Sequence, residues 1–398
     1  MRIAIFSDNF YPELSGIADS ILATAKKLAE RGHQIDFYVP SYSVKDFAKS
    51  NLVKKEIDLG PNIIIHRFFS CHFPTATGQG RIVIPTLWRW LKMRAHKPDI
   101  IHTHLFFGMG FEALAAAKFL KLPLVGTNHT AITEFVKQIP IGAKFLEKLS
   151  LKFVSWFYNK CDFVSAPAQG ILNEMMVNGF IKPSQVIYNP ADIINFYPAP
   201  IEEKTRLRMQ YNFSDQVVLC VGRIAPEKHV DVVIRAINLV KNDFPDINLL
   251  IVGHGSMMAN LKQLVQEMKL EKNVKFLGTL NKIELAKIYR TADLLATAST
   301  SEIQSLCLID AFASAIPAVG VNARGLAESI DESDGFVVEP GDYRAMAEKI
   351  IFLLKNPEIS AKMGRAGNLG VQEFSEEKIA SKWEEIYQQA INNKKPEH

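Results

Sequence analysis

The stretch Gln216-Val-Val-Leu-Cys-Val-Gly-Arg-Ile-Ala-Pro-Glu-Lys-His-Val230 carries the pattern that sets the fold class. It opens with a short, continuously apolar run, which is typical of a strand buried on both faces of a sheet. Gly222 ends that run, two cations follow in the loop, and a helix is expected over 230–240. A buried strand, a loop and a helix in succession begin a βαβ unit, which predicts a parallel sheet covered by helices.

The same alternation recurs along the whole chain of 398 residues. In the first half, strands are expected at 3–6, 35–39, 63–65, 100–101, 122–125 and 163–164, with helical segments between most of them. In the second half, strands are expected at 216–221, 247–252, 274–277, 293–296, 318–321 and 336–338, with helices at about 230–240, 256–269, 282–290, 305–314 and 342–355. The predicted fold class is α/β, with two doubly wound parallel-sheet domains in series.

The division between the domains is expected near Asn189-Pro-Ala-Asp-Ile-Ile-Asn-Phe-Tyr-Pro-Ala-Pro200, where prolines and asparagines interrupt both hydrophobic periods. The length of the chain also exceeds what one ordinary core requires. The predicted first domain covers 1–195 and the second covers 196–374. A final helix within 375–398 has no strand after it, so it must pack on a domain already built.

The composition is that of a soluble globular protein, with 48% apolar and 22% charged residues. No apolar run reaches the roughly 18–20 residues that span a bilayer. The amino-terminal apolar run meets Asp8 too early for the apolar region of a signal peptide. Cys71, Cys161, Cys220 and Cys307 show no paired metal-binding or redox spacing, so they are expected to be reduced thiols in a cytoplasmic protein.

Charge is distributed unevenly along the chain. Residues 1–190 contain 22 Lys and Arg against 14 Asp and Glu, whereas residues 191–398 contain 24 against 28. This asymmetry predicts an anionic partner for the first half, which could be a membrane surface, a nucleic acid or an acidic substrate. No nucleic-acid recognition motif accompanies the charge, so a nucleic acid is the least favoured of the three.

Arg223 and Lys228 form the first candidate site, because they lie between the carboxyl end of a strand and a helix. A guanidinium fork, an ammonium group and helix N–H groups together can bind a diphosphate. In an arbitrary loop two solvated cations would be the better interpretation, but ligands bind at this edge of doubly wound sheets. Gly16 lies at the equivalent place in the first domain, where a glycine permits close backbone approach. The absence of Gly-x-Gly-x-x-Gly argues against a dinucleotide-binding fold.

Three histidines lie at the ends of neighbouring strands in the first domain. His129 ends a central strand and is expected to face the ligand. His102 and His104 form a His-x-His pair, which fits either a metal pair or a hydrogen-bonded structural pair. No third ligand has suitable spacing, which favours the structural pair. The chain also contains no Asp-x-Asp, which argues against a carboxylate-held divalent cation on the phosphates.

Two acids, Glu302 and Asp310, flank the start of a largely apolar helix. Ser305 is a candidate N-cap for this helix, whose free N–H groups can bind phosphate. The two carboxylates can accept hydrogen bonds from the vicinal hydroxyls of a ribose or a hexose. The alternative is a pair of ordinary solvated acids, which the apolar neighbours of Asp310 make less favourable.

Together these residues resemble the pattern of glycosyltransferase family 4 on the GT-B fold, and the resemblance covers nearly the whole chain. Arg223 and Lys228 match its Arg-x4-Lys phosphate pair, and Glu302 and Asp310 match the two ends of its Glu-x7-Glu motif. The remaining matches are Gly16 with the first-domain glycine loop, His129 with the histidine near the transferred sugar, and Asn189-Pro-Ala-Asp192 with the interdomain Asn-x-x-Asp.

This resemblance implies two Rossmann-like domains facing a central cleft, with the last helix crossing back to the first domain. It implies retaining transfer of a hexose from a nucleoside diphosphate sugar, without an essential metal or other cofactor. His129 and Glu302 would be the catalytic residues, Asp310 would contact the ribose, and Ser305 and Leu306 would give backbone N–H groups to the phosphates. No enzymic nucleophile is evident, which agrees with the front-face mechanism usually proposed for such enzymes.

Within the family, Thr300-Ser-Glu-Ile-Gln-Ser-Leu306 most resembles the Ser-Glu-Thr-Gln-Gly-Leu form of bacterial diacylglycerol glucosyltransferases. This suggests UDP-glucose as the donor and a membrane lipid such as diacylglycerol as the acceptor. The chain departs from the family pattern at Asp310, which replaces Glu, and at Ser305 and Ala315, which replace glycines. Two alternatives therefore stay open. One is an enzyme with a soluble sugar acceptor, and the other is a degenerate GT-B protein that binds nucleotide sugar or lipid without catalysis.

Two basic and aromatic segments of the first domain favour a membrane acceptor. No acid occurs between Asp58 and Asp99, where cations and tryptophans mix as at an anionic membrane interface. The residues expected to contact the membrane or the acceptor are Trp88, Arg89, Trp90, Lys92, Arg94, Lys144, Lys148 and Lys152. The last three form a lysine stripe at helical spacing, and the alternative is a solvated face over a core helix. The expected location is cytoplasmic, with peripheral attachment to the cytoplasmic face of the membrane.

Overall fold

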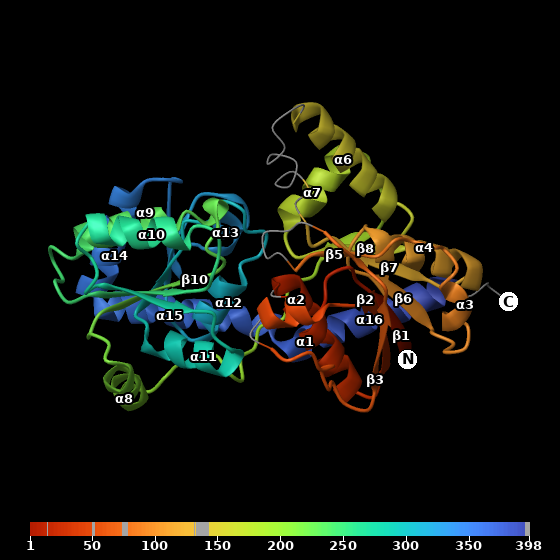
Figure 1. Ribbon diagram of the computed structural model, residues 1–398, viewed down its shortest axis with the longest axis horizontal. Coiled ribbons are helices and arrows are strands. Elements are labelled where there is room, and N and C mark those ends of the chain that lie inside the picture. Colours follow the sequence, from red (N-terminus) through yellow and green to blue (C-terminus); the bar gives the residue numbers. More distant parts are fainter. Residues whose placement is uncertain (14, 50–51, 74–78, 131, 133–142, 395–398) are drawn as a thin grey trace. The chain divides into compact units, whose positions relative to one another are not determined.

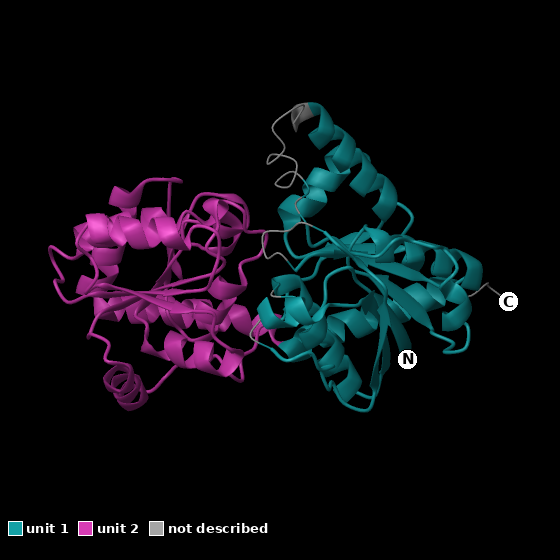
Figure 2. Ribbon diagram, viewed as in Figure 1, with its two compact units in different colours: residues 1–190, 376–398 teal, residues 191–375 magenta. Residues whose placement is uncertain are grey.

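Two separate parallel sheets, each covered by helices, make up the molecule, and this confirms the expected α/β class. The structure is a computed structural model that describes residues 1–13, 15–49, 52–73, 79–130, 132 and 143–394. The chain forms two compact units (Figure 2): unit 1 contains residues 1–190 and 376–398, and unit 2 contains residues 191–375. The boundaries expected from the sequence, after residues 195 and 374, lie close to these divisions.

The sheet of unit 1 has seven parallel strands in the order β3-β2-β1-β6-β7-β8-β9 (Figure 1). Residues 3–6 of β1 are all buried because helices cover both faces of the sheet, which explains the continuously apolar run. The strands are β1 (Arg2–Phe6), β2 (Gln34–Pro40), β3 (Ile63–Phe68), β6 (Ile100–Thr103), β7 (Leu124–Thr127), β8 (Phe163–Ala166) and β9 (Ser184–Val186). A short antiparallel pair, β4 (Cys71–His72) and β5 (Arg81–Ile82), stands outside this sheet.

The helices of unit 1 include the last helix of the chain, α16 (Glu376–Lys394). Its side chains Ile379, Trp383 and Tyr387 are buried in the same core as β1 and β2, so the expected return to the first domain is confirmed. The other helices are α1 (Gly16–Glu30), α2 (Val44–Lys49), α3 (Trp90–Met93), α4 (Gly108–Leu120), α6 (Ala143–Tyr158) and α7 (Gln169–Val177).

The sheet of unit 2 has six parallel strands in the order β12-β11-β10-β13-β14-β15. The strands are β10 (Val217–Val221), β11 (Asn248–Val252), β12 (Val274–Gly278), β13 (Leu294–Ala296), β14 (Ala318–Val321) and β15 (Gly335–Val338). The direction in which the chain adds strands reverses between β10 and β13, so a crevice for ligands is expected beyond their carboxyl ends.

The helices of unit 2 include the five expected from the sequence and three others. The expected ones are α9 (Val230–Val240), α10 (Met258–Glu267), α11 (Lys282–Thr291), α12 (Leu306–Ala313) and α14 (Tyr343–Lys355). The others are α8 (Ile201–Tyr211), α13 (Arg324–Ser329) and α15 (Pro357–Val371), and short 3-10 turns occur at η1 (Pro226–Lys228) and η2 (Gln372–Phe374).

Candidate active site

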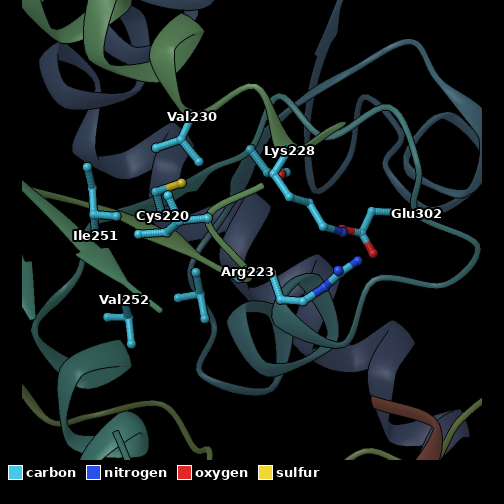
Figure 3. A pocket seen from close by; sticks show the side chains of 11 residues that line it. Cys220, Arg223, Lys228, Val230, Ile251, Val252 and Glu302 are labelled. Atoms are coloured by element: carbon cyan, nitrogen blue, oxygen red, sulfur yellow. The ribbon is translucent and has the colours of Figure 1, made fainter. Parts of the chain in front are cut away.

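A pocket lies in unit 2 at the point where the strand order reverses (Figure 3). Its walls come from the end of β10, the loop that follows it, the end of β11, and the segment after β13. Arg223, Lys228 and Glu302 are its charged side chains. The structure therefore brings together three residues that the sequence analysis selected from two separate segments.

Lys228 and Glu302 form a close ion pair, with the Lys228 Nζ 2.5 Å from the Glu302 Oε1. Both side chains are more than four-fifths buried, so water screens this attraction less than it would at the surface. The η1 turn brings Lys228 inward, and His229 then reverses the backbone in the left-handed region with a φ of 45°. Figure 3 shows the Lys228 side chain reaching to Glu302.

Arg223 lies on the more open side of the same pocket, with its side chain 41% exposed. Its guanidinium pairs with the Glu227 carboxylate at 3.1 Å. The two cations predicted to bind phosphate are thus each paired with an acid in the structure. To bind Arg223 and Lys228, a diphosphate would have to displace Glu227 and Glu302. Because breaking a buried ion pair costs free energy, only a strong anion can replace these carboxylates.

The loop that carries Glu302 is fixed by backbone contacts to two other segments. The Thr300 N–H donates to the Glu227 carbonyl at 3.1 Å, which ties this loop to η1. The Gly325 N–H donates to the Glu302 carbonyl at 3.0 Å, and a Cβ at Gly325 would lie only 1.7 Å from the Ile303 carbonyl oxygen. Gly325 was not selected from the sequence, because only the folded chain shows that α13 begins against this loop.

The start of α12 differs in one respect from the expectation. Ser305 occupies the N-cap position, but its hydroxyl makes no capping hydrogen bond and instead contacts the Cys307 Sγ at 3.0 Å. The first-turn N–H groups of α12, including that of Leu306, are of the kind that binds anions at helix starts. Asp310 is half-buried in the second turn of the same helix.

Two further predicted residues, His129 and Gly16, belong to unit 1. Gly16 is the first residue of α1, after the N-cap Ser15, whose hydroxyl accepts from the Ile17 N–H at 3.2 Å. His129 follows β7 and is buried, and this burial lowers the pKa of its imidazole to about 4. His129 is therefore neutral at physiological pH.

His102 and His104 also lie in unit 1, and each has partners in the protein. The His102 Nδ1 lies 2.7 Å from the Tyr387 hydroxyl, and the His104 Nδ1 lies 3.0 Å from the His129 Nε2. These contacts agree with the hydrogen-bonded structural pair rather than the metal pair.

A different group of possible metal ligands, Asp36, His66 and His96, places its ligand atoms within 4.8 Å of one another. The Arg2 guanidinium lies in this group, with its Nε 2.6 Å from the Asp36 carboxylate and its outer nitrogen 3.1 Å from the His96 Nδ1. His66 also contacts the Asp36 carboxylate, at 3.0 Å. The carboxylate is thus already neutralised by an arginine, and the group is an ion-paired network.

The basic segment around α3 divides into exposed and internally paired side chains. Trp88, Lys92 and Arg94 are exposed. Arg89 is largely buried and pairs with the buried Glu112 carboxylate at 2.9 Å, which neutralises its charge within the protein. Trp90 is partly buried and stacks on the Phe119 ring at 5.0 Å. Arg89 and Trp90 thus hold the segment, whereas the other three face solvent.

An exposed apolar stripe runs along α6, beside the predicted lysines. Phe145, Leu149, Phe153 and Trp156 recur at intervals of three or four residues and are all exposed. Lys148 and Lys152 are exposed on the same helix, and the side chain of Lys144 lies outside the described residues. In the described part of the chain, no helix combines the length and hydropathy needed to cross a bilayer.

Two family models match the chain in succession. A model described as Glycosyltransferase Family 4 matches residues 14–194, and one described as Glycosyl transferases group 1 matches residues 203–369. Together they cover most of each unit.

Curated relatives match over most or nearly all of the chain. The chain is 25% identical to the alpha-monoglucosyldiacylglycerol synthase of Acholeplasma laidlawii, with 99% of each chain covered. It is 26% identical to the enzyme of the same name from Streptococcus pneumoniae, over 80% of this chain and 70% of that one. It is also 26% identical to the N-acetyl-alpha-D-glucosaminyl L-malate synthase of Bacillus anthracis, with 97% of each covered.

Solved structures share the fold. Sucrose-phosphate synthase from Thermosynechococcus elongatus superposes with a TM-score of 0.76 at 20% identity, covering 99% of this chain and 100% of that one. Anabaena HepE in complex with UDP-glucose superposes with a TM-score of 0.73 at 19% identity, covering 98% and 100%. At these identities the likeness establishes the fold alone.

Proposed function

Because the chain is a glycosyltransferase of family 4, we propose that it moves a hexose from a nucleoside diphosphate sugar, with UDP-glucose favoured, to a membrane lipid such as diacylglycerol. The anomeric configuration is retained and no essential metal takes part. The observation that carries the donor half of this proposal is the pocket of unit 2, where Arg223, Lys228 and Glu302 meet at the strand reversal.

The ion pair between Lys228 and Glu302 suggests how the donor would organise its own site. A diphosphate competes with the Glu302 carboxylate for the Lys228 ammonium group, which lies 2.5 Å from it in the structure. Once the phosphate takes Lys228, the carboxylate is free to accept hydrogen bonds from the sugar hydroxyls. Phosphate binding and sugar binding are thereby coupled through one lysine.

The remaining donor contacts follow from the start of α12. Backbone N–H groups of Ser305 and Leu306 face the phosphates, and the Asp310 carboxylate accepts from the ribose hydroxyls. The hydroxyl side chain at Ser305 turns toward Cys307, so the serine that replaces the family glycine has an internal partner. Gly16 permits a close backbone approach on the side of unit 1, and His129 contacts the transferred sugar as a neutral imidazole.

In the proposed reaction, the bond between the anomeric carbon and the diphosphate oxygen breaks while the acceptor hydroxyl attacks the same face of the sugar. The acceptor proton passes to the departing phosphate oxygen. Arg223 and Lys228 neutralise the charge that develops on the diphosphate, which is the electrostatic stabilisation that such a step requires.

A lipid acceptor is supported by the names of two relatives and by the surface of unit 1. Both alpha-monoglucosyldiacylglycerol synthases are named for a glucosylated diacylglycerol product. The exposed stripe of α6 combines four large apolar side chains with Lys148 and Lys152, a mixture that suits an anionic bilayer interface. Trp88, Lys92 and Arg94 would add a second contact. The protein would then act at the cytoplasmic face of a membrane.

A soluble acceptor is the second candidate, because the Bacillus anthracis relative is named for an L-malate product and matches 97% of this chain. A binding protein without catalysis is the third, motivated by Asp310 and Ser305. One experiment separates all three. Radiolabelled UDP-glucose, UDP-N-acetylglucosamine and GDP-mannose are each offered with diacylglycerol in anionic vesicles, with L-malate, or with no acceptor.

Label is expected in the lipid phase, from UDP-glucose, and only when diacylglycerol is present. Transfer to L-malate would replace the lipid proposal with the soluble one. Binding of UDP without transfer from any donor would contradict the enzyme assignment of the donor site.

The membrane contact has its own test. The double substitution Lys148→Gln with Lys152→Gln is expected to weaken binding to anionic vesicles by about 30-fold, since each lysine near the surface contributes about 1 kcal/mol. The matched control, Lys272→Gln with Lys362→Gln, removes two exposed lysines of unit 2 and is expected to change binding less than twofold. Vesicle sedimentation measures binding in both variants. An equal loss of vesicle binding in the two would mean that the net charge of the protein, and not the surface of α6, accounts for the binding.

A further inference from the structure

Three buried histidine rings form a stack in unit 1 that ends at His129. The His102 and His104 ring centroids are 4.0 Å apart, and those of His104 and His129 are 5.3 Å apart with nearly parallel planes. His102 lies on β6 and His104 just after it, two residues apart, so both side chains fall on one face of the sheet. His129 reaches the stack from the end of the neighbouring strand, β7.

The far end of the stack is held by the last helix of the chain. The Tyr387 hydroxyl of α16 lies 2.7 Å from the His102 Nδ1, and the Trp383 ring packs 4.6 Å from the His102 ring. The other nitrogen of His102, Nε2, lies 2.7 Å from the Thr127 hydroxyl. Both nitrogens of His102 are therefore engaged, which fixes its ring.

The contact between His104 and His129 joins two uncharged imidazoles. Burial lowers the pKa of His129 to about 4, and burial with the neighbouring histidines lowers the pKa values of His102 and His104 well below their ordinary value. In the 3.0 Å contact between the His104 Nδ1 and the His129 Nε2, one nitrogen must therefore donate its hydrogen and the other must accept it. This bond decides whether the other His129 nitrogen, Nδ1, is a donor or an acceptor.

We propose that His104 is a positioning residue for the sugar-transfer reaction: it fixes the orientation and the tautomer of the His129 imidazole, and it is itself supported by the ring of His102, which Tyr387 of α16 holds in place. The proposal rests on the proposed function, in which His129 contacts the transferred sugar. A sugar hydroxyl can both donate and accept, so the tautomer decides which of the two it does toward His129: it donates to an unprotonated ring nitrogen and accepts from a protonated one.

Two substitutions at one position isolate the hydrogen bond from the packing. His104→Asn places an amide near the former Nδ1, where it can donate or accept, whereas His104→Leu fills similar space without a polar atom. His104→Leu is expected to lower kcat by about 10- to 100-fold, the range seen when the partner that orients a metal-ligating histidine is removed. His104→Asn is expected to recover most of that loss. The Kd for UDP should change less than threefold in both variants, because UDP lacks the sugar and its pocket lies in unit 2.

A second measurement does not depend on activity. The ¹⁵N chemical shifts of the His129 ring are expected to report one tautomer in the unsubstituted protein and in His104→Asn, and a mixture of both in His104→Leu. Tyr387→Phe removes only the hydroxyl that contacts His102, and it is expected to lower kcat by a smaller factor, about three- to tenfold, with the Kd for UDP unchanged.

The outcomes separate this inference from the function on which it rests. If His129→Ala keeps full transfer activity, the assignment of His129 to the sugar fails, although the tautomer shifts still test the role of His104. If His129→Ala is inactive but His104→Leu is fully active, or shows a single tautomer, the positioning role is overturned. Equal losses in His104→Leu and His104→Asn, in step with a lowered melting temperature, would also overturn it, because packing would then explain both.

Discussion

Glu302 is the residue on which the proposed donor site depends most, since one carboxylate serves two partners in turn. In the structure it neutralises Lys228, and in the proposed complex it accepts from the sugar hydroxyls. Its position is set by its own backbone, because the Gly325 N–H holds the Glu302 carbonyl. The side chain can therefore change partners while the loop stays in place.

The first prediction concerns Glu302→Gln. The amide cannot form the ion pair, so Lys228 is free for phosphate, and UDP is expected to bind about three- to tenfold more tightly, as the release of a partly buried ion pair worth about 1 kcal/mol implies. Transfer is expected to fall at least about 100-fold, because the carboxylate that orients the sugar is lost. Calorimetric titration with UDP and the transfer assay measure the two effects. Weaker binding of UDP, or transfer at the normal rate, would contradict the dual role.

The second prediction concerns Gly325→Ala. The added Cβ would lie 1.7 Å from the Ile303 carbonyl oxygen, so the loop carrying Glu302 must shift, at a cost of about 1–3 kcal/mol in the free energy of unfolding. Transfer is expected to fall by about tenfold or more, because the carboxylate moves with its loop. Gly370→Ala is the matched control: it lies in α15 with no atom near the added Cβ, and it is expected to be neutral or slightly stabilising. Equal activity in the two variants would refute this role for Gly325.

The residues of the candidate site were partly predictable from the sequence, and the reason is chemical. Arg223, Lys228 and Glu302 stand out because charged side chains at the carboxyl ends of buried strands are expected to meet ligands. Gly325 does not stand out, because its importance comes from a backbone contact between two loops. The bonding of the Ser305 hydroxyl was also unpredictable, since its contact with the Cys307 Sγ depends on the local rotamers.

At the scale of secondary-structure elements, α4 is held at its first turn by a buried acid that the sequence analysis did not select. The Asp8 carboxylate, which follows β1, accepts from the Met109 N–H at 3.0 Å and 3.1 Å to its two oxygens. Burial nevertheless dominates and raises the pKa of Asp8 to about 7, although the backbone hydrogen bonds act in the opposite direction. The folded protein therefore binds a proton here that the unfolded chain releases near pH 4.

The third prediction follows from this linkage, with Asp8→Asn as the variant that does not titrate. The folded pKa lies above the unfolded one, so Asp8 contributes its full stability below pH 4 and loses it as the pH rises toward 7. The unsubstituted protein therefore loses stability between pH 5 and pH 6.5, whereas Asp8→Asn does not lose it through this group. The difference between their free energies of unfolding, variant minus unsubstituted protein, should rise by up to about 1.4 kcal/mol per pH unit. Urea unfolding at the two pH values measures this difference. A difference that is independent of pH would show that the carboxylate stays charged in the folded state.

Two helices that escaped prediction, α8 and α15, each carry features that obscure a buried helix in the sequence. Only Leu207 of α8 is buried, and the helix is held instead by ion pairs from Lys204 and Arg208 to Asp293. The sequence of α15 contains three glycines, which are poor helix formers. One of them, Gly364, is required by packing, because a Cβ there would lie 2.0 Å from the Ala315 carbonyl oxygen. Tertiary contacts thus replace the local signals on which a sequence pattern depends.

At the scale of the whole molecule, two hydrophobic cores are built from a chain that leaves unit 1 at residue 190 and returns at residue 376. The parallel sheets of both units follow from the βαβ pattern and could be predicted from the sequence, whereas the order of their strands is known only from the folded chain. The four tryptophans all belong to unit 1, at positions 88, 90, 156 and 383. Intrinsic tryptophan fluorescence therefore reports the unfolding of unit 1, and UDP binding reports the integrity of unit 2.

The fourth prediction uses this separation. Trp383→Ala is expected to lower the free energy of unfolding of unit 1 by about 3–5 kcal/mol, because the indole is buried in the core of that unit and leaves a cavity. The Kd for UDP is expected to change less than twofold, since no residue of α16 belongs to the core of unit 2. Fluorescence of the remaining tryptophans during urea unfolding and calorimetric titration with UDP make the two measurements. Loss of UDP binding in a folded variant would mean that the two cores do not act independently.

The return of α16 to unit 1 also has a consequence for synthesis on the ribosome. Residues 191–375 must be translated before α16 appears, which takes roughly 10 to 40 s at ~5–20 residues per second. Throughout that interval the first sheet of the nascent chain is exposed where Trp383 and Tyr387 later pack. His102 also lacks the hydroxyl of Tyr387 as a partner. A chain released while unit 2 is still being translated would expose this apolar surface and would depend on chaperones. Its histidine stack would lack the contact from α16. The contact that holds His102 can therefore form only after nearly all of the chain has been translated.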